Sequence, residues 1–171
     1  MMLIVSNNKR KTRGFSYIEM VFSVAMLALL AAVATPYLEK NIQRKKETEL
    51  RQNLRQIRTA IDSYKAAADA GKIKRSVGDS GYPPSLESLV EGVEDISSLN
   101  KQKLFFLRHI PTDPMYPLAS QPAMRAINPA ETWGKRSYQS DADYPREGAD
   151  VYDVYSLSAD IANNGVAYRD W

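Results

Sequence analysis

The chain has 171 residues, enough for one modest globular domain together with a membrane segment. It contains no cysteine, which excludes a disulfide framework and a thiolate metal site. The formal net charge is +3, but four of the 23 basic residues lie at positions 9–13. Without them the chain carries 19 basic and 20 acidic residues, so its composition argues against nucleic acid as a partner.

The N-terminal stretch joins a basic cluster to a long apolar run. Residues 9–13, KRKTR, precede Gly14, and within residues 15–38 the only formal charge is Glu19. A helix over residues 15–38 is long enough to cross the roughly 30 Å hydrocarbon core of a bilayer. A carboxylate within such a span costs about 2.5–3.5 kcal/mol, so Glu19 needs a partner.

The stretch KRKTRGFSYIEM resembles the prepilin signal of type IV pilins and of type II secretion pseudopilins. The resemblance implies that residues 1–14 are a leader, that a prepilin peptidase cuts between Gly14 and Phe15, and that Phe15 is then N-methylated. It also implies that Glu19 pairs with the freed amine of Phe15 during filament assembly. Tyr17 departs from the family, which more often has an aliphatic residue there. The alternative is a signal anchor, or a secretory signal cut within AAVATPY.

Pro36 removes one backbone hydrogen bond and is predicted to kink the helix, or to begin a new turn, at the membrane surface. Beyond it, apolar residues recur at spacings of three and four, which predicts an amphipathic helix that ends near Gly71. These residues are Leu38, Ile42, Leu50, Leu54, Ile57, Ile61 and Tyr64.

An unbroken helix over residues 15–70 would be about 85 Å long, and its N-terminal half has nothing in this chain to pack against. That half therefore needs lipid or neighbouring copies. Small residues within it would let helices approach closely, although they serve equally well as apolar filler. They are Ala25, Ala28, Ala31, Ala32 and Ala34.

The charged part of this helix interleaves acids and bases. Glu47 lies four residues before Arg51, and Arg58 lies four before Asp62, so we predict a solvated face with pairs along the helix. Lipid headgroups are the alternative contact for its lysines and arginines.

After a loop, residues 85–92 are predicted to form a short helix with Ser85 as its N-cap, and residues 97–109 a second short helix or turn. The Tyr82-Pro83 pair and the Pro-punctuated segment IPTDPM at residues 110–115 are similar to elements of the major pseudopilins. His109 is the single histidine and lacks partners for a catalytic role, so we interpret it as a structural or surface residue.

Three strands are predicted over residues 135–140, 150–158 and 165–171. Neither face of the middle segment is purely polar, so we expect it to be the central strand of a small antiparallel sheet. Packed on the long helix, this sheet gives an α+β fold of the type IV pilin kind.

The C-terminal segment begins with LSAD, which resembles the start of the calcium loop of the major pseudopilins. The resemblance offers Asp160, Asn163, Asn164 and Asp170, with the carbonyl of Leu157, as Ca²⁺ ligands. The family's loop is longer and more acidic. The alternative is a turn at Asn163-Asn164-Gly165 between two strands.

The sequence contains no catalytic constellation, so we do not expect an enzyme. We predict a leader over residues 1–14, a transmembrane and assembly helix over 15–38, and an amphipathic helix with a periplasmic globular domain over 39–171. The resemblance implies a structural subunit of a pseudopilus that drives type II protein secretion. Its implied partners are copies of itself, other pseudopilins, the prepilin peptidase, an inner-membrane platform with its ATPase, and the lipid bilayer. A type IV pilin or minor pilin, or a membrane-anchored binding domain that never polymerises, are the alternatives.

Overall fold

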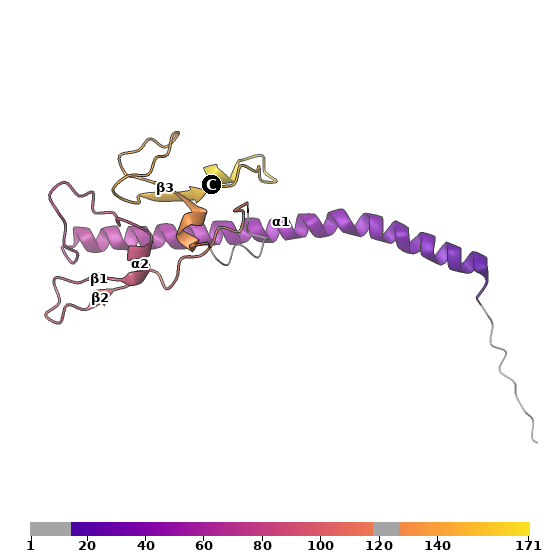
Figure 1. Cartoon of the computed structure of the whole chain (residues 1–171), viewed down its shortest axis with the longest axis horizontal. Helices are drawn as coiled ribbons and strands as arrows, with labels where there is room; N and C mark the ends of the chain where they lie inside the picture. The colour runs from indigo at the N-terminus through magenta and orange to yellow at the C-terminus, as the bar shows by residue number, and fades with distance from the viewer. Residues whose placement is uncertain (1–14, 118–126) are drawn as a thin grey trace, which may run out of the picture. The chain divides into compact units, whose positions relative to one another are not determined.

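The computed structural model describes residues 15–117 and 127–171, and only the backbone of residues 33–36 and 38. The chain divides into two units, Met1–Ile42 and Gln43–Trp171. Helix α1 (Tyr17–Asp69) supplies the described helix of the first unit and continues into the second, which contains all the other elements (Figure 1). The fold is α+β, as predicted.

The end of α1 follows the sequence prediction closely. The helix stops two residues before Gly71, whose φ of 72° lies in the left-handed region that glycine adopts without strain. The backbone N–H of Lys72 donates to the carbonyl oxygen of Ala67 at 3.0 Å, and that of Gly71 donates to Ala68 at 3.1 Å. These bonds satisfy carbonyls that the last helical turn leaves free, so the chain can reverse there.

The predicted helix at residues 85–92 is present as the shorter α2 (Glu87–Glu91). The hydroxyl of Ser85 accepts a hydrogen bond from the backbone N–H of Ser88 at 3.3 Å, but the residue at the N-cap position is Leu86, one later than predicted. Gly92 follows with a φ of 79°, so the helix ends where the sequence placed its end.

The segment after α2 forms a hairpin that the sequence did not indicate. Strand β1 (Val93–Glu94) pairs antiparallel with β2 (Lys103–Leu104), in the register Val93 to Leu104 and Glu94 to Lys103. The prediction of a short helix or turn over residues 97–109 is therefore wrong at its centre. Each strand has only two residues, too few for an alternating pattern to be visible.

The second sheet is smaller than predicted. A 3-10 helix, η2 (Pro129–Thr132), leads into β3 (Trp133–Arg136), which pairs antiparallel with β4 (Asp153–Ser156). The segment predicted as a third strand ends instead in a 3-10 helix, η3 (Tyr168–Asp170). Strand β4 is thus not central: among the described strands it pairs with β3 alone.

Alternation along β4 does follow the predicted period of two. Val154 and Ser156 are buried, whereas Asp153 and Tyr155 between them are partly exposed. On the partly exposed face of β4, the ring of Tyr155 lies over Gly134 of β3. A Cβ atom at Gly134 would lie 2.3 Å from this ring.

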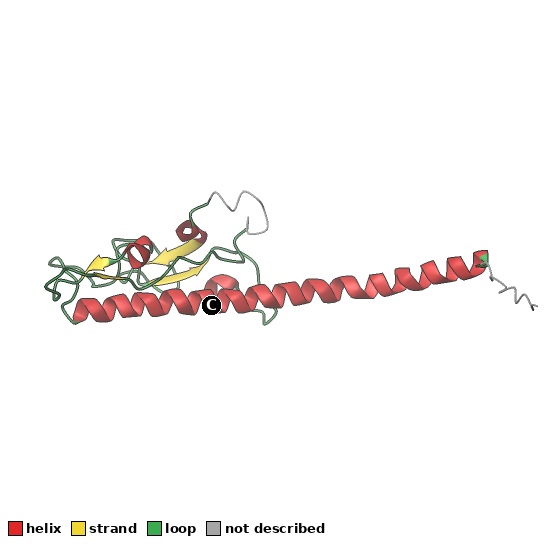
Figure 2. Cartoon of the chain, turned by 90° about the horizontal axis from the view of Figure 1, so that it is seen from below, coloured by secondary structure: helices red, strands yellow, loops and turns green. Residues whose placement is uncertain are grey.

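The core of the second unit forms along the predicted apolar stripe of α1. In Figure 2 the strands and α2 lie on one side of this part of the helix, and they cover that stripe. The described core residues come from α1, α2, both strands of the second sheet and η3: Leu50, Leu54, Ile57, Ile61, Leu86, Leu89, Trp133, Val154 and Tyr168 are among those less than 3% exposed.

Candidate functional site

The described side chains of α1 in the first unit form an uncovered apolar surface. Phe15 is 80% exposed, and the large apolar side chains that follow it are between about half and four-fifths exposed. They occupy successive positions rather than one stripe, so every side of the helix is apolar: Tyr17, Ile18, Met20, Val21, Phe22, Val24, Met26, Leu27, Leu29 and Leu30. A helix that is apolar all round requires an apolar environment on every side.

Glu19 is the single charge in this surface and lies in the first turn of α1. A carboxylate in the first turn interacts favourably with the helix dipole. The hydroxyl of Ser23 donates to the backbone carbonyl of Glu19 at 2.7 Å, not to its carboxylate. The Glu19 carboxylate is exposed and has no hydrogen bond or ion pair within the described ranges. The amine that would pair with it after cleavage is at Phe15, one turn away.

The other predicted features of this segment fall partly on residues that the structure does not describe. Gly14, with the rest of residues 1–14, lies outside the described residues. Helix α1 runs without a break through position 36, but the side chain of Pro36 is not described, so the kink stays a prediction.

Within the described residues, no helix was found with a stretch long and apolar enough to traverse a lipid bilayer. The predicted span over residues 15–38 includes five residues whose side chains are not described, at positions 33–36 and 38.

Four of the five residues offered for calcium make side-chain contacts with other groups of the protein. Asn163 donates to Glu47, and the side-chain oxygen of Asn164 accepts from the backbone N–H of Val166 at 3.1 Å. Asp170 forms an exposed ion pair with Arg169 at 3.4 Å. Asp160 accepts from the hydroxyl of Ser158 at 3.3 Å through its carboxylate. Leu157, whose carbonyl was the fifth proposed ligand, directly follows β4 and is 44% exposed.

The turn of the alternative is present at Asn163-Asn164-Gly165, but it does not join two strands. An isolated antiparallel bridge joins Ile161 to Ala167, and the backbone N–H of Ala162 donates to Val166 at 2.9 Å. Gly165 has a φ of 83°. In the described part of the chain, no three Asp, Glu, His or Cys side chains converge as a metal site would require. The proposed ligand set, two aspartates with two asparagines and a carbonyl, stays a prediction.

Glu47 holds the C-terminal segment to α1, a role that the sequence analysis missed. One carboxylate oxygen, Oε1, accepts from the backbone N–H of Asn163 at 3.2 Å, from its Nδ2 at 2.9 Å and from the hydroxyl of Tyr168 at 3.0 Å. The same hydroxyl accepts from Nε2 of Gln43 at 3.1 Å. Burial raises the pKa of Tyr168, and the Glu47 carboxylate acts in the same direction. We call these four residues the Glu47 clamp.

The predicted ion pairs along α1, Glu47 with Arg51 and Arg58 with Asp62, are not the contacts that Glu47 and Arg58 make. Glu47 is buried instead of pairing with Arg51 on a solvated face, and Arg58 pairs with Asp153 at 2.7 Å. A signal was present: Glu47, Leu50 and Leu54 follow the spacing of the buried stripe, so Glu47 points to the core.

The Pro-punctuated loop around Asp113 is also built into the core. The Asp113 carboxylate accepts from the hydroxyl of Ser156 at 2.5 Å and from the backbone N–H of Met115 at 2.7 Å. Burial raises the pKa of Asp113, and these hydrogen bonds oppose the rise. The indole N–H of Trp133 donates to the carbonyl of Pro111 at 2.7 Å. The loop thus joins η2 and both strands of the second sheet.

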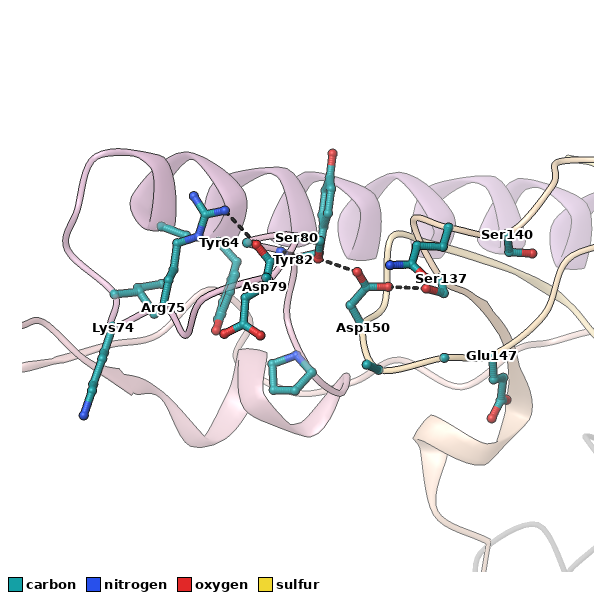
Figure 3. A pocket seen from close by; sticks show the side chains of 18 of the residues that line it. Tyr64, Lys74, Arg75, Asp79, Ser80, Tyr82, Ser137, Ser140, Glu147 and Asp150 are labelled. Atoms are coloured by element: carbon teal, nitrogen blue, oxygen red, sulfur yellow. Dashed lines mark hydrogen bonds between the residues drawn. The ribbon is translucent and has the colours of Figure 1, made fainter.

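A cavity of about 420 Å³ lies between the loop after α1 and the loop from β3 to β4. Figure 3 shows Asp150 between Ser80 and Ser137, whose hydroxyls both donate to it. The backbone N–H of Tyr138 adds a third bond at 3.0 Å. Burial opposes ionisation of Asp150, but these donors lower its pKa below the ordinary value. The carboxylate is already satisfied, so it joins the two loops and is not placed to act as a base.

Comparison with known proteins gives one informative similarity. The type IV major pilin protein PilA of Myxococcus xanthus (strain DK1622) is 37% identical to this chain over 65 residues. These residues make up 38% of this chain and 30% of PilA, so the chain matches less than a third of that protein. No family model matches the chain. No solved structure matches it either. The similarity supports a type IV pilin-like family and is to a pilin, not to a pseudopilin.

Proposed function

We propose that the chain is a structural subunit of a pilus-type filament and that its copies associate through the apolar segment of α1. The observation that carries the proposal is the helix surface over residues 15–30, apolar on every side and carrying one carboxylate. Such a surface is stable in lipid or against other apolar helices, and it is unstable in water. The similarity to a type IV major pilin over 65 residues supports the same function.

Before assembly, residues 15–38 anchor the subunit in the bacterial inner membrane, with the leader in the cytoplasm and the Gln43–Trp171 unit in the periplasm. The basic residues at positions 9–13 favour this orientation, because positive charge is retained on the cytoplasmic side. A prepilin peptidase removes residues 1–14, and the new amine of Phe15 then lies one helical turn from Glu19. Pairing between copies, amine to carboxylate, would offset the cost of burying Glu19 in an apolar filament core.

Within this class, we propose a pseudopilus of type II secretion. Two sequence elements support this proposal, because they are similar to elements of the major pseudopilins: the segment IPTDPM and the Tyr82-Pro83 pair. Asp113 of the IPTDPM segment is buried in the core. An inner-membrane platform and its ATPase would drive assembly together with other pseudopilins. The subunit itself needs no catalytic site, because the work comes from polymerisation.

A type IV pilin is the second candidate, and the similarity to PilA favours it. The two candidates differ in what a deletion removes. Loss of a pseudopilin abolishes secretion of folded proteins and leaves surface fibres intact, whereas loss of a type IV pilin abolishes the fibres. Complementation of both phenotypes with this chain separates them.

The proposed function is tested by intact mass and N-terminal sequencing of the membrane-extracted protein, expressed with and without a prepilin peptidase. We expect a peptidase-dependent product that begins at N-methylated Phe15. A product that keeps residues 1–14, or one cut within AAVATPY, would instead indicate an anchored or secreted binding domain.

Replacing Glu19 tests assembly separately from processing. Glu19→Leu removes a charge that costs about 2.5–3.5 kcal/mol in a bilayer, so the subunit should still insert in the membrane but fail to form sedimentable filaments. Glu19→Asp keeps the charge and is the matched control. Filaments of normal yield from the leucine variant would contradict the proposed pairing.

A further inference from the structure

A groove on the Gln43–Trp171 unit combines positive charge with apolar side chains. It has a volume of about 320 Å³ and lies between α1 and the C-terminal segment. We call it the arginine groove and define it by Arg51, Leu54, Arg55, Arg58, Val166 and Trp171.

Two of the three arginines keep their charge available to a ligand. Arg58 is neutralised locally, because its Nε donates to the Asp153 carboxylate at 2.7 Å and its Nη2 to the carbonyl of Trp171 at 2.9 Å. The guanidinium of Arg51 lies 4.2 Å from the centre of the Trp171 indole ring. Arg55 is exposed and has no ion-pair or hydrogen-bond partner in residues 15–117 and 127–171. The residues that line the groove include no Asp or Glu, and Asn164 is their one uncharged polar side chain.

The charge of Arg51 and Arg55 combines with an apolar lining at Val166 and Trp171. This combination fits a carboxylate flanked by apolar side chains.

The hairpin β1–β2 carries the matching chemistry. Glu94 is exposed, and its carboxylate has no partner within the described part of the chain. Ile96 is 55% exposed and Leu99 fully so, and both lie in the loop that joins the two strands. Figure 1 shows the hairpin near the end of α1, away from the C-terminal residue at the groove. The two surfaces are therefore different patches of one unit.

We propose that the hairpin of one copy docks in the arginine groove of a second copy, with Glu94 against Arg55 and the apolar loop against Val166 and the Trp171 ring. A contact between two different patches is head-to-tail, so it extends an assembly instead of closing it as a dimer. This inference rests on the proposed filament function. It adds a second contact, outside the apolar helices, that sets the register between neighbouring folded units.

Site-directed cross-linking tests the contact directly, because the chain has no native cysteine. Full-length Arg55→Cys and Glu94→Cys variants are co-expressed, filaments are collected by sedimentation, and mild oxidation is followed by non-reducing electrophoresis. We expect a disulfide-linked dimer only when both variants are present. Arg55→Cys with Glu131→Cys is the matched control, because Glu131 is another exposed carboxylate. It should give no dimer.

The outcomes separate this contact from the proposed function. Filaments without an Arg55–Glu94 cross-link above the control would overturn the docking proposal and leave the filament function standing. Absence of filaments from the unsubstituted chain would overturn both.

Charge reversal provides a second measurement that does not depend on cysteine chemistry. Arg55→Glu or Glu94→Arg alone should lower the sedimented fraction about two- to fivefold, as expected for one exposed ion pair, and the double variant should restore it. Failure of the double variant to recover would overturn the pairing. If Arg55→Glu instead reduces sedimentation with anionic lipid vesicles and leaves filament yield unchanged, the groove binds headgroups and the docking proposal is wrong.

Discussion

Replacing Glu47 with alanine is expected to release the C-terminal segment from α1. The Oε1 atom of Glu47 accepts three hydrogen bonds, two from Asn163 at 3.2 and 2.9 Å and one from the Tyr168 hydroxyl at 3.0 Å. Alanine offers no acceptor, so all three donors lose their partner. Tyr168 is 1% exposed, and water does not reach its hydroxyl without a local rearrangement.

The size of the effect follows from which donors water can satisfy. Asn163 is exposed, so water replaces most of what its two bonds contributed. The buried Tyr168 hydroxyl loses a bond to a charged acceptor, which contributes about 1.5–3 kcal/mol. We therefore expect Glu47→Ala to lower the free energy of unfolding by about 2 kcal/mol and the unfolding midpoint by about 6–10 °C.

Thermal and urea unfolding of the detergent-solubilised full chain measure this loss, and hydrogen exchange at the Asn163 amide reports the loop itself. Glu47→Gln keeps one acceptor oxygen and should lose less than alanine. Glu49→Ala removes an exposed carboxylate from the same helix and should change stability by less than about 0.5 kcal/mol. Equal stability of the Glu47→Ala and Glu49→Ala variants, with unchanged exchange at Asn163, would refute the clamp.

Three further predictions concern the folded unit. Gly134→Ala should lower the free energy of unfolding by about 1–3 kcal/mol, because its Cβ would lie 2.3 Å from the Tyr155 ring. Adding Tyr155→Ala should remove most of this penalty in a urea double-variant cycle. The lowered pKa of Asp150 contributes stability above the ordinary aspartate value of about 3.9, and this is lost as pH falls through the lower folded-state pKa. Asp150→Asn should therefore reduce stability at neutral pH and flatten the acid limb of the stability profile; an unchanged slope would contradict this. Millimolar Ca²⁺ or a chelator should leave the unfolding midpoint unchanged if the segment is only a turn, whereas a rise with Ca²⁺ that Asp160→Ala abolishes would support the predicted calcium site.

The sequence predicted correctly those elements whose conformation depends on residues close together in the chain. The end of α1 before Gly71, the end of α2 at Gly92 and the turn at Asn163-Asn164-Gly165 each depend on a few neighbouring residues. The elements that were predicted wrongly are short, and their own residues do not decide their conformation. The hairpin β1–β2 has two residues in each strand, and the predicted third strand became η3. Short, irregular segments take their conformation from what they pack against.

The sequence by itself determined the long helix and the division between its apolar and amphipathic parts, and it contains the stretch whose resemblance to a prepilin signal suggests a filament subunit. These properties follow from the spacing and composition of residues that lie close together in the chain. Only the tertiary structure decided the partners of the charged and polar side chains. Glu47 meets Asn163 and Tyr168 more than a hundred residues away, and Asp113 meets Ser156. Burying a carboxylate is tolerated only where folding gathers enough donors around it, and no spacing along the chain encodes that arrangement.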